Sequence, residues 1–137
     1  MSEPIHDLET DIRWARILIV DDLAANVEML EEALELDGYA NIVSCSDPVE
    51  ALAMIDAGRF DLILLDMRMP VLNGWDFATR YRARQGRHAP VVVMTAARDA
   101  AGRAAQVEAE AYLAKPFDLD DLFAVTARFV QLNRSAR

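Results

Sequence analysis

The chain has 137 residues, of which 53% are hydrophobic and 27% charged, a balance typical of one globular domain and unlike that of disordered or collagen-like chains. Fourteen basic and 23 acidic residues give a net charge of −9, which argues against direct binding to nucleic acid or to an anionic membrane. No apolar run approaches the roughly 18 residues that span a bilayer, and the acidic amino terminus lacks a signal-peptide core. We therefore expect a cytoplasmic protein.

Short apolar runs rich in β-branched residues alternate with longer segments of helical periodicity, the βαβα pattern of an α/β domain. The first run, Arg16–Val20, is too continuously apolar for a strand with a wet face, so we predict a parallel strand covered on both sides. A helix is predicted over Leu23–Leu36, with Leu23 at the start of its apolar stripe and Gly38 just after its end.

The second strand is predicted over Ala40–Cys45, and the helix behind it has clear start and stop signals. Asp47 can accept a hydrogen bond from a first-turn amide, Pro48 suits the first helical position, and Gly58 closes the end. The third strand follows over Asp61–Leu65. These signals predict a short helix between two buried strands.

The second half of the chain continues the same alternation. In chain order, the predicted elements are a helix over Gly74–Arg84, a strand over Val91–Met94, a helix over Asp99–Val107, a strand over Ala111–Ala114 and a helix behind Asp118. The helix after the fourth strand is rich in alanine and weakly amphipathic, so we expect it to be loosely packed. The final helix is predicted to turn Leu119 and its periodic partners toward the core.

Five strands and five helices in strict alternation predict an α/β fold with a doubly wound parallel sheet. Right-handed crossovers leave few arrangements for such a chain, and the strand order 2-1-3-4-5 is the expected one. This domain is assigned to residues 15–133, with residues 1–14 as an N-terminal tail and residues 134–137 as a C-terminal tail.

Polar residues follow four of the five predicted strands. They are Asp21 and Asp22 after the first strand, Asp66 after the third, Thr95 after the fourth, and Lys115 after the fifth. Because the carboxyl ends of parallel strands share one edge, we expect these side chains to converge in one crevice. Three clustered carboxylates raise one another's pKa unless a cation joins them, and Mg²⁺ suits such oxygen ligands. Taken singly, an aspartate here can also be a helix cap, and the threonine can bond a loop.

Lys115 is the only lysine, and its compact ammonium group fits a phosphoryl oxygen at a crowded site. The proline that follows it, Pro116, makes the peptide bond between them a candidate for the cis form. An anion of phosphoryl type is therefore a fitting ligand for the predicted crevice.

The segments ILIVDD, LILLDMRMP, VVVMTA and YLAKPF together resemble the receiver domain of two-component response regulators. The resemblance covers nearly the whole chain and implies the CheY-like form of the flavodoxin-like fold. It implies that Asp66 accepts a phosphoryl group from a phosphohistidine on a histidine kinase or a histidine phosphotransfer protein. The implied Mg²⁺ ligands are Asp21, Asp22, Asp66 and the backbone carbonyl of Arg68. Thr95 and Lys115 would contact phosphoryl oxygens, and Tyr112 matches the aromatic switch position, although it also fits a plain strand aromatic.

By the same resemblance the protein is a phosphorelay signalling domain and not an enzyme, and its open site is compatible with slow self-dephosphorylation. Phosphorylation would change the surface of the fourth helix, fifth strand and fifth helix for a downstream protein target, or the phosphoryl group would pass onward in a relay. The sequence leaves both routes open. No output domain fits beside the predicted domain, so we expect a stand-alone receiver, either monomeric or forming a weak, phosphorylation-dependent dimer.

The competing class is a Mg²⁺-dependent phosphohydrolase that uses an aspartyl-phosphate intermediate. Such enzymes need a second acid two residues after the nucleophile, where this chain has Arg68. A receiver that only binds partners is a third alternative, disfavoured because all five site residues are present.

Three further features lie outside this scheme. They are Trp75, interpreted as packing; the basic run Arg80, Arg82, Arg84 and Arg87, interpreted as a solvated helix face with a partner contact as the alternative; and Glu108, which stands where many receivers have a glycine. None of them is predicted to take part in the chemistry.

Overall fold

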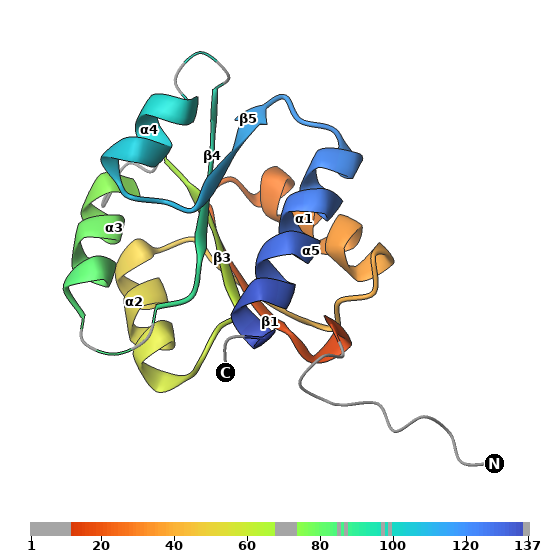
Figure 1. Ribbon diagram of the computed structural model, residues 1–137, viewed down its shortest axis with the longest axis horizontal. Helices are drawn as coiled ribbons and strands as arrows, with labels where there is room; N and C mark the ends of the chain where they lie inside the picture. The colour runs from red at the N-terminus through yellow and green to blue at the C-terminus, as the bar shows by residue number, and fades with distance from the viewer. Residues whose placement is uncertain are drawn as a thin grey trace.

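The structure is a computed structural model that describes residues 12–67, 74–84, 86, 88–96, 98 and 100–135. Five strands form one parallel sheet in the order β2-β1-β3-β4-β5 (Figure 1). The strands are β1 (Arg16–Val20), β2 (Asn41–Cys45), β3 (Leu62–Asp66), β4 (Val91–Ala96) and β5 (Ala111–Lys115). The helices are α1 (Ala24–Leu36), α2 (Pro48–Ala57), α3 (Gly74–Ala83), α4 (Ala100–Gln106) and α5 (Leu119–Ser135), with a 3-10 turn η1 (Ile12–Trp14) before β1. The predicted fold class and strand order are confirmed.

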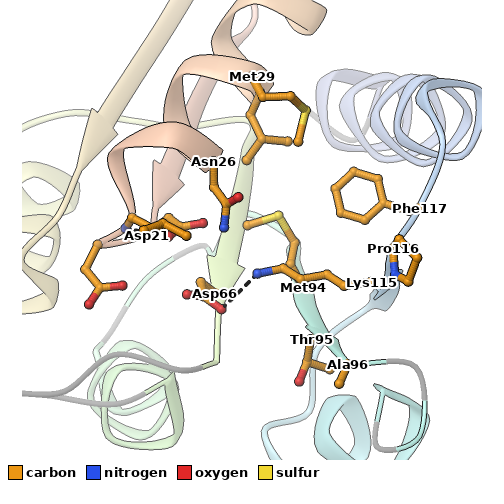
Figure 2. A pocket seen from close by; sticks show the side chains of 13 residues that line it. Asp21, Asn26, Met29, Asp66, Met94, Thr95, Ala96, Lys115, Pro116 and Phe117 are labelled. Atoms are coloured by element: carbon orange, nitrogen blue, oxygen red, sulfur yellow. Dashed lines mark hydrogen bonds and ion pairs between the residues drawn. The ribbon is translucent and has the colours of Figure 1, made fainter.

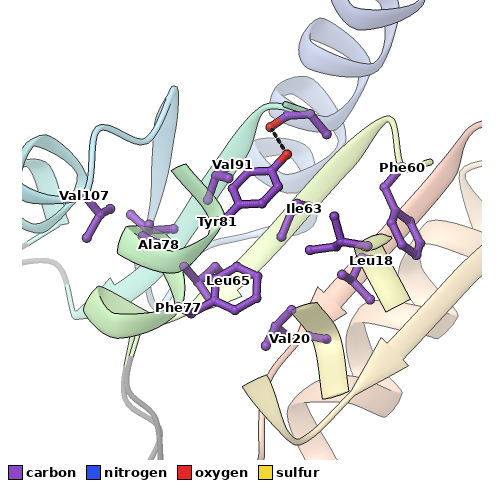
Figure 3. Packing of buried hydrophobic residues seen from close by; sticks show 14 of the residues in the cluster. Leu18, Val20, Phe60, Ile63, Leu65, Phe77, Ala78, Tyr81, Val91 and Val107 are labelled. Carbon is purple, nitrogen blue, oxygen red and sulfur yellow. Dashed lines mark hydrogen bonds between the residues drawn. The ribbon is translucent and has the colours of Figure 1, made fainter. Parts of the chain in front are cut away.

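Helices cover both faces of the sheet. Because successive strand residues point to opposite faces, β3 sends Ile63 and Leu65 to one core and Leu62 and Leu64 to the other. The first core lies under α2, α3 and α4 and is shown in Figure 3, and the second lies under α1 and α5. All four leucine and isoleucine side chains are fully buried, which explains why β3 is an apolar run without alternation. The edge strands β2 and β5, which were also predicted to be covered on both sides, are only partly buried because each has a neighbouring strand on one side alone.

The pairing register aligns the carboxyl ends of neighbouring strands. Asp66 pairs with Met94, which places the end of β3 beside Thr95, the next residue of β4. Thr95 in turn pairs with Ala114, the residue before Lys115. The sheet therefore delivers an aspartate, a threonine and a lysine to adjacent positions at one edge.

Most of the predicted helix caps are present. The Asp47 carboxylate accepts from the amide of Val49 at 2.9 Å, and the Asp118 carboxylate accepts from the amide of Asp121 at 2.9 Å. Gly38, which ends α1, has a φ of 106°, in the left-handed region where a side chain would be strained. The sequence signals at these positions therefore predicted the helix ends from local chemistry alone.

Two apolar residues at helix starts are not in the core as predicted. Leu23 precedes the first residue of α1 and is 55% exposed, and Leu119, the first residue of α5, is 43% exposed. Both helices begin beyond the carboxyl edge of the sheet, so their first side chains have no strand to pack against. The strands β3, β4 and β5 also extend past the predicted apolar runs, because ladder pairing continues through Asp66, Ala96 and Lys115. Within the described ranges, no helix is both long and apolar enough to cross a membrane.

Candidate functional site

The carboxyl edge of the sheet carries a pocket of about 620 Å³ (Figure 2). Its floor is formed by the ends of β1, β3, β4 and β5, and its walls by the first turns of α1 and the residues after β5. The lining residues are Asp21, Asp22, Leu23, Asn26, Met29, Leu30, Asp66, Met94, Thr95, Ala96, Lys115, Pro116 and Phe117. All five side chains predicted to converge at strand ends are in this set.

Three carboxylates form the acidic part of the pocket. Asp21, Asp22 and Asp66 each offer an oxygen, and these oxygens lie within 4.8 Å of one another. Asp21 and Asp66 are 1% and 4% exposed, whereas Asp22 is open to solvent. Two like charges at this spacing repel by roughly 3.5 kcal/mol at an effective dielectric constant of about 20. The cluster therefore has a strong preference for a bound cation or for a proton.

Asp21 shows this preference directly. One of its carboxylate oxygens accepts from the amide of Leu23 at 2.9 Å, while the other, Oδ2, is buried and has no hydrogen-bond partner among the described residues. Burial raises the pKa of Asp21, and the nearby charge of Asp66 raises it further. The Leu23 amide, the Lys115 ammonium and the side-chain amide of Asn26 offset part of this rise. The first strand thus ends in a buried carboxylate that is short of donors.

Lys115 places a positive charge next to the acidic cluster. Its Nζ lies 3.5 Å from Oδ1 of Asp66, and Figure 2 draws this ion pair across the pocket. The Lys115 side chain is 34% exposed, so the ammonium faces both the carboxylate and the open pocket. The peptide bond between Lys115 and Pro116 is cis, as the sequence suggested. A group bound beside Asp66 would meet this ammonium.

Thr95 supplies a hydroxyl that is free to bond a ligand. The residue is 2% exposed, and its Oγ1 makes no hydrogen bond to any described group. A buried hydroxyl without a partner costs free energy, so it favours any acceptor that enters the pocket. Phosphoryl oxygens are such acceptors, and they would also pair with Lys115.

The donor set fits a hard divalent cation. Mg²⁺ prefers oxygen ligands and usually combines one or two carboxylates with waters and substrate oxygens. Asp21, Asp22 and Asp66 meet that requirement, and the unpartnered Oδ2 of Asp21 is the observation that makes the fit specific. The backbone carbonyl of Arg68, also predicted as a ligand, lies outside the described residues.

Tyr112 is not part of this pocket. It lies on β5 with 46% of its surface exposed and lines a separate groove of about 420 Å³ between β5 and α5. The pocket instead has three residues that sequence reasoning missed, Asn26, Met29 and Phe117. Asn26 and Met29 are in the first two turns of α1, and Phe117 follows the cis proline. The signal in the sequence was their closeness to the ends of the strands. Helical periodicity predicts which side chains face the core, but not which ones line a pocket beyond the edge of the sheet.

Comparisons with known proteins identify this architecture. Residues 17–127 match the family described as the response regulator receiver domain. The response regulator MprA of Mycobacterium avium is 40% identical over 111 residues, which cover 80% of this chain and 48% of that protein. The chain thus spans about half the length of the curated relatives it matches.

Solved structures show the same relationship. A crystal structure of a putative response regulator from Chloroflexus aurantiacus has a TM-score of 0.78 and 29% identity, covering 85% of this chain and 98% of that one. The receiver domain of a sensor histidine kinase from Pseudomonas aeruginosa has a TM-score of 0.77 and 32% identity, with the same coverage, and holds a magnesium ion coordinated in its active site cleft.

The chain therefore belongs to the response regulator receiver domain family of two-component signalling. Receiver domains are signalling modules and not enzymes in the usual sense, so the phosphohydrolase alternative is not favoured.

Proposed function

We propose that this receiver domain accepts a phosphoryl group on Asp66 from a phosphohistidine on a histidine kinase or a histidine phosphotransfer protein. The observation that carries the proposal is the position of the Asp66 carboxylate. It stands at the end of β3, 3.5 Å from the Lys115 ammonium and within 4.8 Å of oxygens of two further aspartates, in an open pocket. This combination of a nucleophile, a cation and an accessible cavity suits phosphoryl transfer.

In the transfer, an oxygen of Asp66 attacks phosphorus as the bond from phosphorus to the donor's imidazole nitrogen breaks. The electron pair of that bond stays on the imidazole, and the product is an acyl phosphate on Asp66. Little covalent help is needed for this reaction, because the main barrier is the charge spread over the equatorial phosphoryl oxygens. Lys115 neutralises part of that charge, and the Thr95 hydroxyl donates to another oxygen.

The proposal includes Mg²⁺, held by Asp21, Asp22 and Asp66, with the Arg68 carbonyl as a further ligand. When bound, the ion supplies charge neutralisation for the acidic cluster and for the incoming phosphoryl group. The carboxylates themselves orient the site: Asp21 is fixed by the amide of Leu23, and Asp66 is fixed by its strand and by Lys115. The buried oxygen of Asp21, which has no hydrogen-bond partner in the part of the chain that the structure describes, supports this assignment.

Phosphorylation is proposed to be read through Thr95 and Tyr112. A phosphoryl group of about −2 charge offers strong acceptors to the unpartnered Thr95 hydroxyl, which draws the end of β4 toward Asp66. Tyr112 lies on the neighbouring strand and is half exposed, so it has room to change rotamer as Thr95 moves. The altered surface of α4, β5 and α5 would then bind a downstream protein, or the phosphoryl group would pass to a histidine phosphotransfer protein.

The test is the mass of the intact protein after incubation with Mg²⁺ and a small phosphodonor such as acetyl phosphate. We expect a gain of one phosphoryl group that is lost in Asp66→Asn. The matched control is Asp120→Asn, an exposed aspartate of α5 away from the pocket, which should label like the parent. Labelling that persists in Asp66→Asn would contradict the assignment. Transfer from a phosphorylated histidine phosphotransfer protein, and back to it, would then separate a relay intermediate from a terminal effector.

A further inference from the structure

The first turn of α3 is tied to the last turn of α4 by side chains. The indole Nε1 of Trp75 donates to Oε1 of Gln106 at 2.7 Å, and the guanidinium of Arg103 lies over the Trp75 ring, 4.8 Å from its centroid. Trp75 also packs against the buried cluster beneath α3. It was interpreted from the sequence as packing alone, and the structure adds a hydrogen bond and a cation-π contact to a neighbouring helix.

A second tie joins α3 to the turn that follows α4. Arg82 donates from one guanidinium nitrogen to the carbonyl of Glu108 at 2.8 Å and to Oε1 of Glu110 at 3.1 Å. Glu108 has a φ of 56°, the left-handed conformation that usually favours glycine at a helix end. Arg82 therefore holds the carbonyl of the strained residue in place. Arg84, the residue after α3, is also paired, with Asp56, so these two arginines of the predicted basic run are not simply solvated.

These ties matter because α4 has little packing of its own. The helix has seven residues, and its buried side chains are the alanines Ala100 and Ala104, which remove little apolar surface from water. By contrast, α3 is anchored by the fully buried rings of Phe77 and Tyr81. Val107, the residue after α4, is buried in the same core, so the polar contacts from α3 add to one apolar anchor at the carboxyl end of α4.

The amino end of α4 is connected to the phosphoryl site. Only residues 97–99 separate the end of β4 from Ala100, the first residue of α4. The buried Thr95 hydroxyl has no hydrogen-bond partner among the described residues, so an acceptor on Asp66 would attract the end of β4. One end of α4 would thus be drawn toward the site while its other end is in contact with α3.

We propose that Trp75 and Arg82 of α3, together with Gln106 and the Glu108 carbonyl, form a clasp that holds α4 in the unphosphorylated position and opposes the switch. The proposal rests on Asp66 being the phosphoacceptor. The clasp is made in the conformation described here and opens when α4 follows Thr95. Phosphorylation must therefore break the contacts of the clasp. The strength of these contacts sets the fraction of the protein that is active at a given concentration of phosphoryl ligand.

The consequence for binding follows from linkage. Where the active conformation is a minor fraction of the free protein, the apparent affinity for a phosphoryl ligand is the affinity of that conformation multiplied by its fraction. Removing the hydrogen bond between Trp75 and Gln106 destabilises only the inactive conformation. A net hydrogen bond of ordinary strength corresponds to a change of about two- to tenfold in that equilibrium. The affinity should therefore become tighter by this factor.

The experiment uses beryllium fluoride with Mg²⁺, a stable mimic of a phosphoryl group on a carboxylate. The dissociation constant is measured by calorimetry for the parent, Gln106→Leu, Trp75→Phe and the double variant. We expect each single variant to bind two- to tenfold more tightly than the parent. The double variant should bind no more tightly than the single variants, because all three lose the same hydrogen bond between Trp75 and Gln106. Gln131→Leu, an exposed glutamine of α5, is the matched control and should bind like the parent.

Trp75 itself reports whether the clasp opens. In a Trp14→Phe background it is the only tryptophan, and its emission should change as beryllium fluoride saturates the site. Single variants that bind with the parent's constant or more weakly would overturn the clasp, as would a Trp75 emission that ignores bound ligand. If the parent and Asp66→Asn bind beryllium fluoride equally, the phosphoacceptor assignment fails as well, so the two failures are distinct.

Discussion

Replacing Asp21 with asparagine should stabilise the metal-free protein, although it changes a buried residue of the candidate site. Asparagine keeps the side-chain oxygen that accepts from the amide of Leu23, so the local turn is preserved. It removes one of three negative charges that lie within 4.8 Å of one another. The substitution therefore tests the electrostatic repulsion with little change in shape.

The expected size follows from the spacing. At 4.8 Å, two charges repel by roughly 3.5 kcal/mol at a dielectric constant of about 20 and by roughly 0.9 kcal/mol in water. Asp21 and Asp66 are buried, Asp22 is exposed, and Lys115 offsets part of the repulsion. We expect the free energy of unfolding to rise by about 1–2 kcal/mol in the absence of divalent cations.

The assay is urea unfolding at neutral pH, in EDTA and in saturating Mg²⁺. Mg²⁺ should stabilise the parent by mass action and stabilise Asp21→Asn much less. The difference in free energy of unfolding between the two proteins should therefore shrink or change sign when the ion is added. The control is Asp61→Asn, another buried aspartate, whose carboxylate accepts from the Arg16 amide at 2.9 Å away from the cluster. Asparagine keeps an oxygen for that bond too but relieves no repulsion among the clustered carboxylates, so this variant should gain no stability. The reasoning is refuted if Asp21→Asn is no more stable than the parent in EDTA.

Three further predictions concern pH and local contacts. Burial raises the pKa of Asp21 above its ordinary value of 3.8. The folded protein therefore loses stability relative to the unfolded chain as pH rises from 3.8 through the raised pKa, because the buried carboxyl must ionise. The stability that Asp21→Asn gains in EDTA should accordingly shrink as pH falls through the same range. Burial raises the pKa of Tyr81 to about 12 and its hydroxyl donates to the Ala89 carbonyl at 3.0 Å, so Tyr81→Phe should lower the free energy of unfolding by about 1 kcal/mol in urea titrations at neutral pH. Asp47→Ala removes the cap on the Val49 amide and should cost about 1 kcal/mol in the same assay, whereas an unchanged midpoint would mean the cap contributes nothing.

Local sequence signals accounted for most of the architecture. Continuous apolar runs such as Leu62–Leu65 specify strands buried on both faces, and the cap at Asp47 specifies where a helix begins. Once the alternation of strands and helices is known, right-handed crossovers lead to the observed strand order. The side chains after the strands then share an edge by topology, which is why Asp66 and Lys115 were expected to meet.

The errors lie where packing beyond the sheet decides the outcome. Leu23 has the apolar character of a core residue, yet it stands past the end of its strand and faces solvent. Asn26 was not predicted as a site residue, although its side-chain amide lowers the pKa of Asp21. Helical periodicity predicts which face of a helix is buried, but it does not predict which site lies next to the first turn of the helix. Register and element ends depend on neighbouring strands, which a single stretch of sequence does not contain.

The amino-acid order alone determined the class of fold, the strand order and the five polar groups that gather at one edge, because periodicity, caps and crossover handedness act over short stretches of chain. Tertiary structure alone decided that, among the described residues, one oxygen of Asp21 and the hydroxyl of Thr95 are buried without a hydrogen-bond partner. It also decided that Trp75 contacts the last residue of α4 and that Arg82 contacts the turn after it. Those features depend on how segments far apart in sequence lie next to one another. They exist only once the sheet and both helical layers have packed together.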